Sequence, residues 1–279
     1  MKKSLTIDLL NKAIEAEHAA IIQYLLHAYS MGEGELACEI EAIAREEMRH
    51  LDFLAEAVVG LGGKPSLARG DMRAKGNTVG AWMKNDVLAE EDAISMYGEH
   101  IKAIDDPQIS RLLERILSDE RSHHGDFKHF VESAKKQGLK DVRGKQRDKT
   151  TAVLDWAIEH EYTVVLQYLL HSYLAPNEKI RHEMEDQAIN EMQHMGWLAE
   201  KIVSRGGSPS LEHTKINQSN KSASMLKADI AIEKKVADKY DEAARENKDA
   251  GLQKLYRRIR DHELYHMKVF ADLKKGLKK

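Results

Sequence analysis

The chain has 279 residues, of which 42% are hydrophobic and 32% charged, so it is long enough for two domains with packed interiors. Its formal net charge is −3, with acidic and basic residues interspersed, which argues against nucleic acid as a partner. The four prolines and the low aromatic content (6%) favour an all-α protein.

The first half of the chain predicts four helices, at residues 5–31, 34–60, 80–104 and 108–137. Glycines at 32 and 34 separate the first two helices, and Gly62-Gly63 ends the second. The second half predicts four more, at 150–174, 177–204, 222–247 and 250–275. Residues 138–149 are rich in Lys, Arg, Gly and Asp and read as a linker between domains 1–137 and 150–279.

The two halves repeat one pattern. Gln23-Tyr24-Leu25-Leu26-His27 recurs 144 residues later as Gln167-Tyr168-Leu169-Leu170-His171. Glu47-Met48-Arg49-His50 recurs at the same offset as Glu191-Met192-Gln193-His194. Later offsets are 143, as between Glu90 and Glu233. A period this long indicates a duplicated domain rather than a solenoid repeat.

The connections predict the topology of each copy. Helices one and two are joined by a few residues, so we expect them to be antiparallel neighbours. About 20 residues join helices two and three, enough to run the length of a bundle. Short, long and short connections are typical of a four-helix bundle with one crossover.

Each copy carries a ligand set for two metal ions. One Glu comes from each of helices one and three, and a Glu-x-x-His motif comes from each of helices two and four. The first copy supplies Glu17, Glu47, His50, Glu90, Glu120 and His123. The second copy supplies Glu161, Glu191, His194, Glu233, Glu263 and His266.

The spacing of these residues has a physical reason. Residues i and i+3 share one helix face, so the Glu and the His of one motif can reach the same centre. A carboxylate in a bundle interior is costly unless it is paired or bound to metal. Carboxylate and imidazole ligands suit iron or manganese. The sequence has no cluster of cysteines of the kind that binds structural zinc.

Tyrosines recur beside this ligand set. Tyr24 and Tyr168 lie seven residues after the helix-one Glu, and Tyr97 and Tyr240 lie seven after the helix-three Glu. We expect them to close the core and donate a hydrogen bond to a ligand. The alternative is a direct role for Tyr24 and Tyr168 beside the metal ions.

These motifs resemble the bacterioferritin branch of the ferritin-like superfamily. The resemblance rests on Glu17 through Tyr24, Glu47-Met48-Arg49-His50, Asp86 through Glu90 and Asp119 through His123, and it covers nearly the whole chain, twice. It implies a tandem pair of ferritin-like bundles, each with a di-iron centre that oxidises Fe(II) with O₂ or H₂O₂. The twelve residues named above are then the iron ligands.

The resemblance also implies a haem site. Met48 and Met192 stand where bacterioferritin has a methionine that ligates haem between subunits. The alternative is that these methionines pack between hydrophobic surfaces, which we favour. Bacterioferritin is a single bundle that assembles into a shell, and this chain departs from that pattern. Association of several copies of the chain through bundle faces is an alternative to the shell.

We therefore expect a di-iron ferroxidase in iron handling or oxidative-stress protection. The alternatives are a non-catalytic iron-binding or delivery protein, a di-metal oxidase or peroxidase, a manganese catalase, and a helical scaffold with relic sites. The single Cys38 excludes an intramolecular disulfide. With no signal-peptide pattern and no membrane-spanning apolar run, we expect a cytoplasmic protein without a membrane partner.

Overall fold

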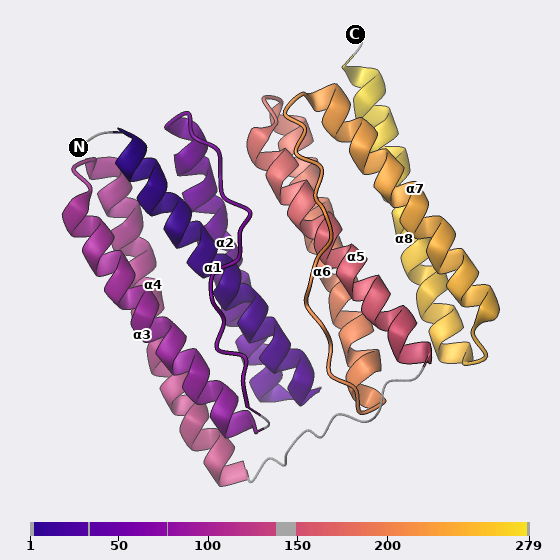
Figure 1. Cartoon of the computed structure of the whole chain (residues 1–279), viewed down its shortest axis with the longest axis horizontal. Coiled ribbons are helices and arrows are strands. Elements are labelled where there is room, and N and C mark those ends of the chain that lie inside the picture. The colour runs from indigo at the N-terminus through magenta and orange to yellow at the C-terminus, as the bar shows by residue number, and fades with distance from the viewer. Residues whose placement is uncertain (1–2, 33, 77, 138–148, 278–279) are drawn as a thin grey trace. The chain divides into compact units, whose positions relative to one another are not determined.

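The computed structural model describes residues 3–32, 34–76, 78–137 and 149–277, and these residues form eight α-helices and no β-strand (Figure 1). The chain divides into two compact units, Met1–Lys145 and Gln146–Lys279. Most of the linker expected at 138–149 lies outside the described residues. The prediction of an all-α chain with two four-helix bundles is confirmed.

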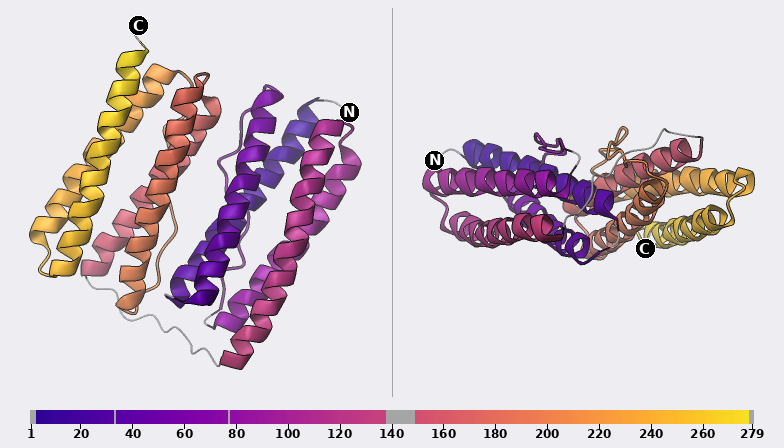
Figure 2. Two further views of the ribbon diagram at one scale, coloured as in Figure 1. Left: turned by 180° about the vertical axis from the view of Figure 1, so that it is seen from behind. Right: turned by 90° about the horizontal axis from the view of Figure 1, so that it is seen from below.

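Bundle 1 contains α1 (Lys3–Met31), α2 (Glu35–Gly60), α3 (Val79–Ala103) and α4 (Pro107–Gln137). Bundle 2 contains α5 (Lys149–Leu174), α6 (Glu178–Ser204), α7 (Ser222–Glu246) and α8 (Ala250–Gly276). In bundle 1, α1 packs mainly on α2, and α3 packs mainly on α4; bundle 2 repeats this pairing. The views in Figures 1 and 2 agree that the helices of each bundle lie lengthwise beside one another.

Local signals place the helix ends. Gly62 (φ 72°) and Gly206 (φ 74°) adopt the left-handed conformation just after α2 and α6, where glycine carries no Cβ penalty. The side chains of Thr78, Asn177 and Asp249 accept hydrogen bonds from backbone N–H groups at the starts of α3, α6 and α8. These caps fix the positions at which the ligand-bearing helices begin.

The long connection between α2 and α3 runs along α1 (Figure 1). Asn11 Nδ2 donates to Lys64 O at its start, and Arg73 N donates to Gln23 Oε1 near its end. The connection in bundle 2 makes the same closing contact, from Asn217 N to Gln167 Oε1 at 2.9 Å. Both connections therefore cross one side of the helix that supplies the first Glu of the ligand set.

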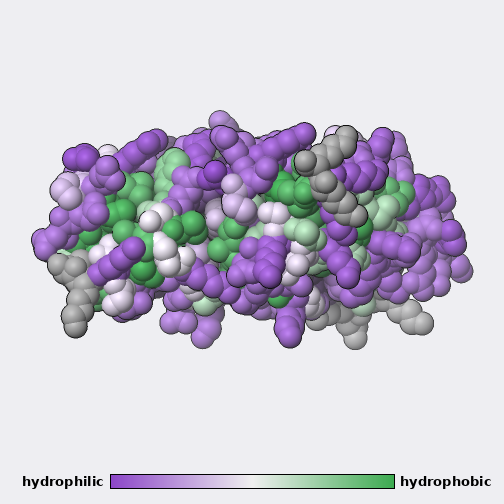
Figure 3. Space-filling model, turned by 90° about the horizontal axis from the view of Figure 1, so that it is seen from above, coloured by the Kyte–Doolittle hydropathy of each residue, from purple (hydrophilic) through white to green (hydrophobic). Residues whose placement is uncertain are grey.

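Each bundle has its own hydrophobic core. Leu10, Ile40, Leu54 and Leu113 are fully buried in bundle 1. In bundle 2, Tyr168, Met184, Met225 and Phe270 belong to one buried cluster. On the face shown in Figure 3, hydrophilic residues cover most of the surface and hydrophobic residues appear in patches between them. No helix in the described part of the chain is both long enough and apolar enough to cross a membrane.

Candidate metal centres

The predicted ligands come together as two clusters, one inside each bundle. Centre 1 consists of two overlapping groups, Glu17, Glu47, His50 and Glu120, and Glu47, Glu90, Glu120 and His123. Centre 2 consists of Glu161, Glu191, His194 and Glu263, and Glu191, Glu233, Glu263 and His266. Within each group the ligand atoms lie within 4.8 Å of one another. The glutamates of the Glu-x-x-His motifs belong to both groups of their centre, so they are placed to bridge two ions. They are Glu47 and Glu120 in centre 1, and Glu191 and Glu263 in centre 2.

All of these side chains are at most 3% exposed. Their burial follows from helix geometry, because i and i+3 positions face the same way and each helix directs one such face inward. The single Glu residues of α1 and α3 face the paired motifs of α2 and α4 across the bundle.

In centre 1, both histidines direct Nδ1 at carboxylates. His50 Nδ1 lies 2.8 Å from Glu47 Oε2 and 3.0 Å from Glu120 Oε1. His123 Nδ1 lies 3.0 Å from Glu47 Oε1. Each imidazole thus contacts a different oxygen of the Glu47 carboxylate.

Centre 2 repeats this geometry. His194 Nδ1 lies 2.7 Å from Glu191 Oε2 and 3.2 Å from Glu263 Oε1. His266 Nδ1 lies 2.7 Å from Glu191 Oε1. The two centres are therefore alike in their innermost residues.

The crowding of buried charges displaces the pKa values of these groups. Burial, followed by repulsion from neighbouring carboxylates, raises the pKa of Glu17 and Glu90 well above the ordinary value. Burial acts in the same direction on Glu47, yet the nearby imidazoles of His123 and His50 lower its pKa to about 2.

The histidines respond in the opposite direction. Burial alone would lower their pKa values, but contacts with Glu120 and Glu47 raise the pKa of His50 to about 11 and that of His123 to about 12. Contacts with Glu191 and Glu263 raise the pKa of His266 to about 9. Without metal, protons therefore partly balance the carboxylate charge of each cluster.

Some inward carboxylate oxygens have neither a hydrogen bond nor one of the close histidine contacts described above. In centre 1 this atom is Glu90 Oε2, and in centre 2 these atoms are both carboxylate oxygens of Glu233. Buried polar atoms without partners are unfavourable, and cations at each cluster would satisfy them together. The residues present therefore fit a pair of metal ions bound by carboxylate and imidazole.

The sequence predicted that all four tyrosines donate a hydrogen bond to a ligand, and three of them do so. Tyr97 donates to Glu17, and Tyr240 donates to Glu161. Tyr24 donates to Glu90 Oε1 at 2.6 Å. The hydroxyl of Tyr168 is buried and makes no hydrogen bond, so this contact is missing from centre 2.

Sequence reasoning missed the groups that contact the outer ring nitrogens. His123 Nε2 lies 2.9 Å from Glu46 Oε2, and His50 Nε2 lies 3.4 Å from Asp119 Oδ2. In bundle 2, His194 Nε2 lies 2.9 Å from His262 Nδ1. Each of these residues directly precedes a ligand Glu in the chain, and that adjacency is the signal that could have identified it.

Met48 and Met192 lie outside both clusters. Each follows a ligand Glu by one residue and is partly exposed. One residue is about 100° around a helix, which directs these side chains away from the carboxylates. Their assignment as haem ligands stays a prediction.

Comparison with known proteins places the chain in a family. The Ferritin-like domain family matches residues 7–136 and again 151–279. The bacterioferritin of Desulfovibrio desulfuricans is 34% identical over 128 residues, which are 44% of this chain and 72% of that protein. Bacterioferritin BfrA of Mycobacterium tuberculosis is 32% identical over 124 residues, 42% of this chain and 77% of the relative.

A solved structure of the Desulfovibrio desulfuricans bacterioferritin, described as showing its diiron site in different catalytic states, is also similar. It is 33% identical, covers 49% of this chain and 83% of its own, and has a TM-score of 0.47. The two separate family matches account for both bundles, and the sequence matches to bacterioferritins confirm the predicted resemblance. The chain belongs to the ferritin-like domain family, as a tandem duplication of a bacterioferritin-like domain.

Proposed function

We propose that this protein is a ferroxidase that binds two iron ions in each bundle and oxidises Fe(II) with O₂ or H₂O₂. The observation that carries the proposal is the set of four buried carboxylates and two imidazoles in each bundle, with inward atoms that lack partners. The relationship to bacterioferritins favours iron over manganese. Fe(II) is here the substrate, and two bound Fe(II) ions supply the two electrons that reduce the oxidant.

The chain's own residues prepare this step in three ways. Four carboxylates per centre balance the charge of two divalent ions. The shared residues, Glu47 and Glu120 in centre 1, hold the two ions close to each other. Tyr97 and Tyr24 donate to the single Glu residues and orient them.

Binding must displace protons from these groups. The raised pKa values of His50 and His123 mean that their Nδ1 atoms carry protons in the metal-free protein. The contacts of their Nε2 atoms with Asp119 and Glu46 keep the ring orientation once Nδ1 is deprotonated.

The test is a titration of metal-free protein with Fe(II) in air, followed by the ultraviolet absorbance of oxidised iron. We expect saturation at about four irons per chain, two for each ligand set. Loss of the signal in a Glu47→Ala/Glu191→Ala variant is the matched control. Iron that binds and stays Fe(II) in air would contradict the proposal and favour a delivery protein or manganese chemistry.

A further inference from the structure

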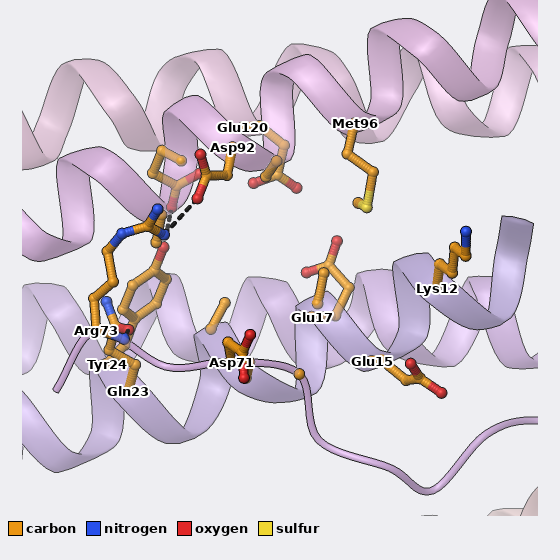
Figure 4. Close-up of a pocket in the computed structure, with 17 residues that line it drawn as sticks. Lys12, Glu15, Glu17, Gln23, Tyr24, Asp71, Arg73, Asp92, Met96 and Glu120 are labelled. Atoms are coloured by element: carbon orange, nitrogen blue, oxygen red, sulfur yellow. Dashed lines mark hydrogen bonds and ion pairs between the residues drawn. The ribbon is translucent and has the colours of Figure 1, made fainter.

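A pocket of about 300 Å³ in bundle 1 reaches centre 1 from the side (Figure 4). It lies between α1, α3 and the long connection, and Glu17, Glu90 and Glu120 are among its lining residues. Figure 4 shows the carboxylates of Glu17 and Glu120 directed at the space between the helices. Five alanines of α1 and α3 also line it, and their small side chains leave this space open: Ala16, Ala19, Ala20, Ala89 and Ala93.

The rim of this pocket carries one more acidic than basic residue. Glu15, Asp71 and Asp92 line it, together with the basic residues Lys12 and Arg73. Arg73 forms an ion pair with Asp92, as Figure 4 shows. Apart from that pair, the rim carries two acidic residues, Glu15 and Asp71, and one basic residue, Lys12, so it favours cations over anions.

Matching hydrogen bonds show which residues of bundle 2 occupy the corresponding positions. Arg73 N donates to Gln23 Oε1, just as Asn217 N donates to Gln167 Oε1. Gln23 and Gln167 in turn donate to Asp86 and Asp229, each at 2.8 Å. The register of helix, connection and following helix is thus the same in both bundles.

At these positions bundle 2 carries larger side chains. His160, Val164 and Val236 replace Ala16, Ala20 and Ala93, and they are 8%, 2% and 1% exposed. The alanines they replace line the pocket of bundle 1. These larger buried side chains take up more of the corresponding space beside centre 2.

Two further contacts in bundle 2 lie where the pocket of bundle 1 gives access to its centre. The ring of Trp156, which replaces Lys12, lies 4.3 Å from that of His160 and 5.9 Å from that of Tyr240, centroid to centroid. Thr163 Oγ1 donates to Glu159 O at 2.7 Å and accepts from Thr214 N at 2.8 Å. In bundle 1 the corresponding residues are Ala19 and Gly70, and Gly70 N donates directly to Glu15 O at 2.9 Å.

The charge on this side of bundle 2 is also reversed. Lys215, Lys235 and Lys239 replace Asp71, Asp92 and Met96, and all three lysines are exposed. Asn217 replaces the rim residue Arg73. Lys239 forms an ion pair with Glu242. Lys215 and Lys235 then stand with Glu159 at the positions that correspond to the rim of bundle 1, so this side is more basic and disfavours cations.

We propose that the two centres load metal at different rates, because the pocket admits cations to centre 1 while filled space and lysines hinder their entry to centre 2. The inference rests on the proposed function, since it takes both clusters as metal centres. It makes centre 1 the rapidly exchanging site and centre 2 a slowly exchanging one. The two centres have the same set of ligands, and the inference concerns the rate at which metal reaches them.

The test measures loading with Co(II) under argon, which reports binding through its visible absorption without oxidation. Centre 1 is isolated in the Glu191→Ala/His194→Ala variant, and centre 2 in the Glu47→Ala/His50→Ala variant. We expect centre 1 to load roughly tenfold faster or more at low salt. Added salt is expected to slow loading of centre 1 and to speed loading of centre 2, because screening weakens attraction and repulsion alike.

Two sets of substitutions outside the ligands separate access from ligand effects. Lys215→Asp/Lys235→Asp/Lys239→Met changes only exposed side chains and is expected to speed loading of centre 2. Ala20→Val/Ala93→Val introduces the bundle 2 residues into the pocket and is expected to slow loading of centre 1 several-fold. Neither set is expected to change the amount of Co(II) bound at equilibrium.

Equal loading rates with the same salt dependence would overturn this inference and leave the proposed function standing. Loading rates that differ between the centres but are unchanged by both sets of substitutions would also overturn it. Absence of Co(II) from both centres at equilibrium would overturn the proposed function, and this inference with it.

Discussion

The outer ring nitrogens of the histidine ligands distinguish the two centres at the scale of single residues. In bundle 1 both face carboxylates, Glu46 and Asp119. In bundle 2, Asn190 stands at the position of Glu46, and its side chain donates to Gln187. A carboxylate beside the outer nitrogen makes the imidazole a stronger ligand and fixes its orientation.

We therefore expect Glu46→Gln to weaken Co(II) binding at centre 1 by roughly 10–100-fold. The measurement is equilibrium titration under argon in the variant that retains only centre 1. Glu39→Gln is the matched control, since Glu39 is an exposed residue of the same helix and loses the same charge. An equal effect of both substitutions would show that net charge, not the contact with His123, sets the affinity.

The tyrosines give a second comparison between the bundles. Tyr24 donates to Glu90, whereas the hydroxyl of Tyr168 has no hydrogen-bond partner. We expect Tyr24→Phe to destabilise the metal-free protein by about 1–3 kcal/mol, because it leaves a buried acceptor unsatisfied. Tyr168→Phe is expected to change stability little. Urea unfolding followed by circular dichroism measures both, and equal losses would contradict the structural difference.

The sequence predicted the ligands because their identity and spacing repeat on four helices, twice. It did not predict Glu46, Asp119 or His262, because each contacts a histidine of another helix. Such contacts depend on the rotation of the helices about their axes, which spacing along the chain does not specify.

At the scale of elements, the crossing of α1 by the long connection depends on a close approach of two backbones. A Cβ at Gly70 would lie 2.9 Å from Glu15 O, closer than side chains tolerate. Bundle 2 has Thr214 there, and Thr163 on α5 places its hydroxyl between Thr214 N and Glu159 O. The two bundles thus use different contacts at one crossing.

We expect Gly70→Thr to destabilise bundle 1 by about 1–3 kcal/mol, because the added atoms meet backbone. Adding Ala19→Thr supplies the hydroxyl seen in bundle 2, so the double variant is expected to lose less than the sum of the two single losses. A double-mutant cycle by urea unfolding tests this coupling. Simple additivity would show that the Thr163–Thr214 contact does not transfer.

The helices themselves were largely predictable. Glycines at the ends of α2 and α6, together with the duplicated pattern, placed the predicted boundaries within two residues of those observed. The pocket in bundle 1 was not predicted, because it results from several alanines on α1 and α3 that meet only in the folded bundle. Alanine is common in helices, so its presence alone signals no cavity.

For the whole molecule, the buried ligands link stability to pH. The pKa values of Glu17, Glu90, Glu161 and Glu233 are raised above the unfolded value, chiefly by burial, and that of His266 is raised to about 9. Groups with raised pKa values bind more protons in the folded state, so folding stability falls as pH rises through that range. Glu47, with a pKa near 2, acts in the opposite sense only below about pH 4.5.

We therefore expect the melting temperature of metal-free protein to fall between about pH 6.5 and pH 9. Co(II) must displace the same protons, so its affinity is expected to rise over this range with measurable proton release. Calorimetry and a pH indicator dye provide the two measurements. A melting temperature that rises with pH would show that these groups do not hold protons in the folded protein.

The division into two compact units, each with its own core and its own ligands, predicts independent metal binding. In the Glu191→Ala/His194→Ala variant we expect bundle 1 to bind about two Co(II) ions with unchanged affinity, as measured by elemental analysis and titration. Metal should then raise the unfolding temperature of one bundle only, because ligand binding stabilises only the unit that contains the site. The reciprocal Glu47→Ala/His50→Ala variant should confine the stabilisation to bundle 2. If either variant loses metal from both bundles, the centres are coupled and the duplicated chain acts as one binding unit.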